Sequence, residues 1–140
     1  MNLMWVVYAL LSASFAALTA IFAKVGVQHM DSNLATAIRT GIILIITWSI
    51  VFFTGSYKSI PGLAGRELLF LLLSGTATGL SWLFYFKAIQ LGDISKVAPV
   101  DKLSIVFVII LAAIFLQEAV TFKTWIGALL ITAGTLVLVL

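Results

Sequence analysis

Five runs of predominantly apolar residues alternate with short polar stretches along this chain. A bilayer with a hydrocarbon core of ~30 Å is crossed by about 20 residues of α-helix. The pattern therefore predicts five transmembrane helices, at about residues 4–23, 34–54, 67–90, 95–115 and 121–140. The linkers between them are too short to hold a soluble domain. We therefore expect one all-α transmembrane domain over residues 1–140, with its function inside the helix bundle.

Composition supports the same class of protein. Of the 140 residues, 63% are hydrophobic and 9% are charged, and the mean hydropathy is +1.24. A soluble domain carries about 25% charged residues, so this chain is too poor in charge to cover a soluble surface. The predicted fold class is a polytopic, all-α membrane protein surrounded by the lipid bilayer.

Several function classes are disfavoured by the same sequence. It contains no cysteine, which excludes disulfides and cysteine-based metal sites. The net charge of +3 is small and no basic cluster is present, so we expect no nucleic-acid partner. There is no metal-ligand spacing, no glycine-rich phosphate loop and no nucleophile paired with a base. We therefore expect no metal, no cofactor and no enzyme activity.

Ionisable side chains interrupt the apolar segments near one end of the predicted bundle. If each helix crosses the membrane once, the same boundary is approached by Lys24, Arg39, Lys87, Asp101 and Lys102. Four of these are positive and one is negative, so this end is basic. Ionisable groups inside a membrane are costly and mark functional sites. We predict solute binding by Arg39, Lys87, Asp101 and Lys102, together with Thr40 beside Arg39.

Structural roles are the alternative for each of these charges. Long Lys and Arg side chains reach the headgroups while their methylenes stay in lipid, which is our interpretation of Lys24 and the alternative for Arg39 and Lys87. Asp101 is too short to reach far. We expect its carboxylate to meet Lys87, Arg39 or a backbone donor, in a structural ion pair or in a solute or proton site. The excess of positive charge favours a carboxylate-bearing or zwitterionic solute over a lipophilic cation.

Polar residues follow one face of the second and third predicted helices at helical spacing: Thr36, Thr40 and Thr47, then Ser74, Thr78, Ser81, Trp82 and Tyr85. Such faces turn towards other helices or water. Bonding of hydroxyls to the backbone explains the isolated Thr and Ser residues equally well. Trp82 and Tyr85 are candidates for a solute-facing pair, because a ring lines a cavity and Tyr offers a hydrogen bond. The alternative is an interfacial aromatic belt.

Gly75 and Gly79 form a GxxxG match in the third predicted helix. Small residues let helix backbones approach closely in lipid. The pair predicts either packing within one protomer or a seam between two protomers.

The basic residues at the two membrane boundaries give almost no orientation preference. Three lie on each side: Lys58, Arg66 and Lys123 against Lys24, Lys87 and Lys96. Orientation follows the Lys and Arg bias of short loops, so this balance indicates insertion in both directions. An antiparallel homodimer would then supply the two oppositely oriented halves that alternating-access transporters contain.

The second half of the chain resembles a known family. Its marks are Tyr85-Phe86-Lys87-Ala88-Ile89, Gly92-Asp93, Val97-Ala98-Pro99-Val100-Asp101-Lys102-Leu103-Ser104, Leu116-Gln117-Glu118, Trp125-Ile126-Gly127 and Ala133-Gly134. These are similar to the EamA domain of the drug/metabolite transporter superfamily, in particular its single-domain, five-helix members. The usual Leu-Gly-Glu of that family is Leu-Gln-Glu here.

The resemblance implies an EamA-like half-transporter bundle. Larger relatives carry two such domains in opposite orientation, and many export metabolites or amino acids. The leading hypothesis is therefore a secondary transporter in the plasma membrane of a prokaryote. It would export a small polar, zwitterionic or anionic metabolite by alternating access, as an antiparallel homodimer. A passive pore and a non-transporting structural subunit of a larger membrane complex are the alternatives.

Overall fold

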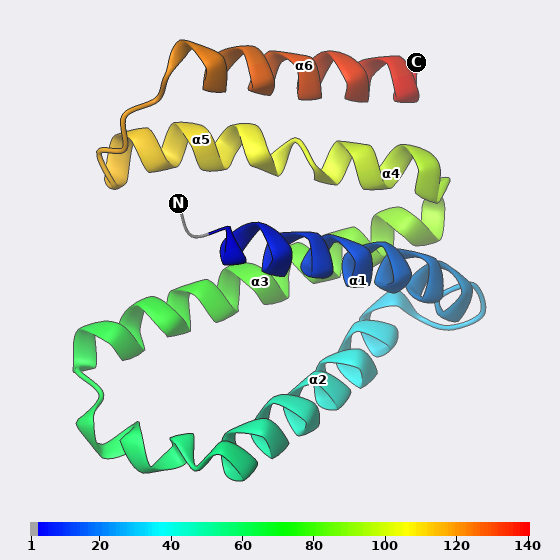
Figure 1. Cartoon of the computed structure of the whole chain (residues 1–140). Helices are drawn as coiled ribbons and strands as arrows, with labels where there is room; N and C mark the ends of the chain where they lie inside the picture. Colours follow the sequence, from blue (N-terminus) through cyan, green and yellow to red (C-terminus); the bar gives the residue numbers. More distant parts are fainter. Residues whose placement is uncertain (1–2) are drawn as a thin grey trace. The chain divides into compact units, whose positions relative to one another are not determined.

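The computed structural model describes residues 3–140, and these form helices and loops without a strand (Figure 1). The elements are α1 (Met4–Gly26), α2 (Ser32–Thr54), the 3-10 helix η1 (Ser56–Gly62), α3 (Gly65–Leu91), α4 (Ile94–Asp101), α5 (Ser104–Phe115) and α6 (Phe122–Val139). By length and apolarity, five segments of the described chain are able to cross a membrane, with α4 and α5 counted together as Ile94–Phe115. This confirms the predicted all-α class with five membrane-length helices.

Local chemistry fixes where α2 begins and ends. Asp31 precedes the helix, and its carboxylate accepts hydrogen bonds from the backbone N–H groups of Asn33 and Leu34 at 2.9 and 3.1 Å. A carboxylate at this position satisfies N–H groups that have no partner inside the helix. Gly55 ends the helix with φ of +73°, a conformation that glycine adopts without a Cβ penalty.

The chain divides into two compact units. The first unit contains the described chain up to Phe22 together with Leu91–Leu140, and the second unit is Ala23–Gln90. The single domain expected from the sequence stays a prediction, and each unit is described by itself below.

In the first unit, α6 packs against α4 and α5 (Figure 1). The sequence predicted one helix over residues 95–115, but the structure interrupts it at Lys102 and Leu103. Lys102 N–H is shared between the Ala98 carbonyl at 3.3 Å and the Pro99 carbonyl at 3.1 Å, and Leu103 N–H donates to the Val100 carbonyl at 3.0 Å. The bonds to Pro99 and Val100 span three residues rather than four, so the backbone tightens into a 3-10 turn.

A side chain from α6 stabilises this interruption. Thr135 is 6% exposed, and its hydroxyl donates to the Pro99 carbonyl at 3.3 Å. A regular α-helix would give that carbonyl the N–H of Leu103, which turns to Val100 instead. Thr135 therefore gives the Pro99 carbonyl a second partner and joins α6 to the turn.

The end of α5 requires a left-handed residue. Gln117 has φ of +54°, and beside it the N–H of Glu118 returns to the Ala112 carbonyl at 3.3 Å. Glycine is favoured in this conformation because it has no Cβ to clash with the backbone. This explains physically why a Leu-Gly-Glu pattern suits the position and why glutamine is strained there.

Replacing Gln117 with glycine is therefore expected to stabilise the protein by about 1 kcal/mol, because the left-handed conformation costs a residue with a side chain roughly 1–2 kcal/mol. Reversible unfolding in detergent measures the difference. Gln117→Ala is the matched control, since alanine keeps the Cβ and should gain nothing. Equal stability of the two variants would show that the backbone strain is not the cause.

Candidate functional site

A cation inside the membrane-length part of the second unit is stacked on aromatic rings. Arg39 lies about two turns into α2, and its guanidinium carbon is 4.3 Å from the ring centroid of Trp82 and 5.4 Å from that of Phe86. Trp82 and Phe86 share a face of α3 because they are four residues apart. Phe86 is 3% exposed. A guanidinium over aromatic faces is attracted by their quadrupoles, most strongly where water is scarce.

The hydrogen-bond donors of Arg39 have no acidic partner in this unit. Its two carboxylates are engaged elsewhere: Asp31 caps α2, and Glu67 accepts the Ala64 N–H at 3.2 Å. Between residues 23 and 90 the structure gives Arg39 no ion pair and no hydrogen bond. A guanidinium carries five N–H donors in a planar fork that matches a carboxylate. The stack therefore presents an unpaired anion-binding fork inside α2.

The other polar candidates beside this stack contribute less directly. The Thr40 hydroxyl donates to the Thr36 carbonyl at 2.8 Å, and the Tyr85 ring meets the Phe86 ring edge-on with centroids 6.4 Å apart. Hydroxyls also bond to the backbone of their own helix at Thr36, Thr47 and Thr78. The hydroxyls of these Thr residues therefore bond to the backbone, which is the alternative stated above for the isolated Thr residues.

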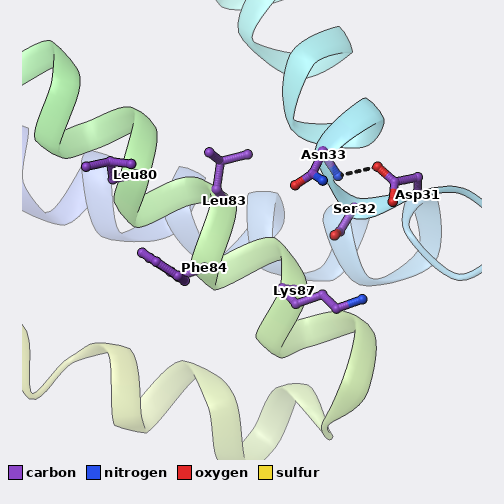
Figure 2. A pocket seen from close by; sticks show the side chains of 7 residues that line it. All are labelled: Asp31, Ser32, Asn33, Leu80, Leu83, Phe84 and Lys87. Carbon is purple, nitrogen blue, oxygen red and sulfur yellow. Dashed lines mark hydrogen bonds between the residues drawn. The ribbon is translucent and has the colours of Figure 1, made fainter.

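Lys87 lies on a different face of α3 from Trp82. It lines a pocket of about 390 Å³ within the second unit (Figure 2). The pocket residues are Asp31, Ser32 and Asn33 at the start of α2 and Leu80, Leu83, Phe84 and Lys87 along α3. The structure thus brings Arg39 and Trp82 together and assigns Lys87 to a separate pocket.

Asp101 and Lys102 belong to the first unit, where the helix is interrupted. Lys102 Nζ donates to Asp101 Oδ2 at 3.3 Å, and the two side chains are 58% and 36% exposed respectively. The carboxylate is thus paired within its own turn, a partner that the sequence analysis did not foresee, while pairing with Arg39 or Lys87 stays a prediction. Among residues 3–140, no three His, Asp or Glu side chains lie close enough to share a metal ion.

Lys24 has a bonding partner within the protein that the sequence did not predict. Its Nζ donates to the Ile89 carbonyl in the last turn of α3 at 2.7 Å. A cation that bonds the last carbonyls of a helix is favoured by the helix dipole. Lys24 therefore also has a structural role beside Val27 and Ile89, which are fully buried, and its reach to the headgroups stays a prediction.

Gln90 was missed by the sequence analysis and connects several parts of the second unit. Its Nε2 donates to the carbonyls of Val27 at 3.2 Å and Met30 at 2.9 Å, and its Oε1 accepts from Lys87 Nζ at 3.2 Å. One amide therefore holds the loop between α1 and α2 against the end of α3. The only sign of this role in the sequence is that Gln90 is a polar residue in the last turn of a largely apolar helix.

Gly75 and Gly79 make no close helix contact in the structure. A Cβ placed on either one would meet no atom within 4 Å. The seam predicted from the GxxxG pattern therefore stays a prediction.

Membrane-length helices that carry an arginine stacked on aromatic rings define a polytopic membrane protein with a candidate anion-binding site. The comparison with known families gives the class: residues 3–140 match the EamA-like transporter family. The chain belongs to this family.

Two relatives are similar over nearly the whole chain. A Sinorhizobium sp. protein named "Uncharacterized transporter in cobO 3'region" is 52% identical over 138 residues, which cover 99% of this chain and 98% of the relative. The Bacillus subtilis (strain 168) protein "Uncharacterized transporter YvbV" is 30% identical over 129 residues, which cover 92% of this chain and 42% of the relative. No solved structure matches the chain.

Proposed function

We propose that the chain is a secondary transporter that exports a small polar, zwitterionic or anionic metabolite by alternating access. The observation that carries the proposal is the Arg39 guanidinium, which is stacked over Trp82 and Phe86 and has no ion pair or hydrogen bond among residues 23–90. A charged group without a partner inside a membrane helix is costly and is retained where function needs it. A carboxylate on the solute would supply the partner that the guanidinium lacks among these residues.

Roles in solute binding follow from the chemistry of each side chain. Arg39 would bind the solute carboxylate, and the Trp82 ring would hold the guanidinium in place. Tyr85 would donate or accept a hydrogen bond, and Thr40, whose O–H donates to the Thr36 carbonyl, would accept one. Asp101 and Lys102 stay candidates for charged parts of the solute, since interrupted membrane helices commonly form transporter sites. Lys87 stays a candidate as well, although it lines the separate pocket.

We further propose that two chains pair antiparallel in the plasma membrane of a prokaryote. The lengths of the relatives support this. The 129 matched residues are 42% of the Bacillus protein, which leaves length for a second such domain, whereas one chain covers 98% of the Sinorhizobium protein. The equal number of boundary Lys and Arg residues on the two sides supports insertion in both directions. Gly75 and Gly79, without a close neighbour, are available as the seam.

Transport in proteoliposomes tests the function. Purified protein is reconstituted, and uptake of radiolabelled organic acids, amino acids and lipophilic cations is followed under an imposed proton or counter-solute gradient. The proposal expects accumulation of an organic acid or amino acid above its outside concentration. Uptake that only equilibrates would indicate a passive pore, and transport of lipophilic cations alone would contradict the Arg39 site.

A further inference from the structure

The pocket that contains Lys87 has a charged end and an apolar wall (Figure 2). One carboxylate, Asp31, and one ammonium, Lys87, stand at its polar end together with Ser32 and Asn33. Leu80, Leu83 and Phe84 form the wall. The pocket thus offers one charge of each sign next to a hydrocarbon surface.

These two parts lie at different depths in the membrane. The start of α2 and the end of α3 approach one boundary, because both are membrane-length helices joined at their other ends through η1 (Figure 1). Leu80 precedes Lys87 by seven residues, which corresponds to about 10 Å along an α-helix. The polar end therefore lies at the headgroup level, and the apolar wall descends into the hydrocarbon core.

Asp31 and Lys87 are each held by hydrogen bonds within the protein and keep further atoms available to bond a ligand. Asp31 uses Oδ1 to cap α2, and its second carboxylate oxygen accepts no hydrogen bond from the described residues. Lys87 Nζ donates only to Gln90 among the residues described, which leaves two of its three N–H groups. Gln90 also bonds the Met30 carbonyl next to Asp31. The same amide therefore orders both sides of the pocket.

We propose that this pocket binds a phospholipid whose headgroup carries a primary amine, in particular phosphatidylethanolamine. The phosphate accepts hydrogen bonds from Lys87, and the ammonium donates to the free oxygen of Asp31. An acyl chain lies along Leu80 and Phe84, which are 53% and 75% exposed. This lipid site is independent of the proposed transport function.

The depth of the pocket favours a lipid over a transported solute. Solute sites of alternating-access transporters lie near the bilayer midplane, whereas Asp31 and Lys87 lie at the ends of their helices. A lipid has its charges at the boundary and its hydrocarbon below, which is the order of groups in the pocket. The Asp31 carboxylate selects the headgroup: a choline ammonium has no N–H to donate, and a glycerol headgroup has no positive charge.

Native mass spectrometry of the full-length protein tests the site. The protein in detergent is titrated with phosphatidylethanolamine, phosphatidylcholine and phosphatidylglycerol that carry identical acyl chains. We expect the ethanolamine lipid to bind at least about 10-fold more tightly than the other two, since a hydrogen bond between charged groups is worth roughly 1.5–3 kcal/mol. Asp31→Asn should bring the three affinities within about 3-fold, because asparagine keeps the N-cap but loses the charge.

Two further measurements distinguish lipid binding in this pocket from lipid binding elsewhere and from binding of a soluble zwitterion. Lys87→Gln should weaken all phospholipids, whereas Lys123→Gln, an exposed boundary lysine at the start of α6, should change none. Water-soluble phosphoethanolamine and leucine should not displace the bound lipid, because neither reaches along the apolar wall. Equal affinity of the wild type for the three lipids, an ethanolamine preference that survives Asp31→Asn, or displacement by a soluble zwitterion would each overturn the proposal.

Discussion

Replacing Arg39 with glutamine is expected to lower solute transport by about 10- to 100-fold at low solute concentration, the equivalent of roughly 1.5–3 kcal/mol for hydrogen bonds to a charged group. Glutamine keeps a polar side chain but loses the charge and the two-pronged donor geometry. Arg39→Lys keeps the charge without the fork and should retain an intermediate activity. Initial transport rates in proteoliposomes, normalised to the amount of reconstituted protein, give both values.

Arg66→Gln is the matched control for this prediction. Arg66 also stands over an aromatic ring, with its guanidinium carbon 5.9 Å from the Phe70 centroid, but it lies in the first turn of α3. Loss of the same kind of cation–π contact there should leave transport close to that of the wild type. If the Arg39 and Arg66 variants lose activity equally, Arg39 has no special role in solute binding.

Replacing Gln90 with leucine is expected to destabilise the protein by about 2–4 kcal/mol, because three hydrogen bonds of about 1 kcal/mol each are lost and a buried carbonyl is left without its donor. The affected carbonyl belongs to Val27, whose residue is fully buried. Leucine is similar in size, so packing changes little. Unfolding in mixed micelles with increasing denaturing detergent measures the free-energy difference.

Gln28→Leu is the control for this stability measurement. Gln28 lies in the same loop, is exposed, and makes no side-chain hydrogen bond with the described residues. The same chemical change should therefore cost much less at position 28. Comparable losses of stability in the two variants would contradict the assignment of Gln90 as the residue that holds the loop on α3.

Hydropathy was sufficient to predict the helices but not their details. The lipid environment demands long apolar segments with internally satisfied backbone groups, and this signal is strong in the sequence. The break between α4 and α5 was not predicted, because it depends on which carbonyl Leu103 bonds and on Thr135 from α6. Such contacts join residues far apart in sequence and leave no periodic pattern.

The candidate site was predicted only in part, because its contacts also join residues that are far apart in sequence. Arg39 and Trp82 were both selected as intramembrane polar or aromatic residues, and the structure brings them together. Phe86 was not selected, although its spacing of four residues from Trp82 would have suggested a shared face. Gln90 and Asp31 were missed because their importance lies in backbone partners at positions 27–34, which composition and charge do not reveal.

Cysteine labelling tests most directly the claim that two antiparallel chains form the transporter. The chain has no cysteine of its own, so single cysteines at Ser59 in η1 and Ser95 in α4 report on opposite membrane faces. An impermeant maleimide is applied to either side of the membrane. The account predicts that each site reacts from each side in about half of the molecules, as dual insertion requires. Labelling of each site from one side alone would contradict the antiparallel homodimer.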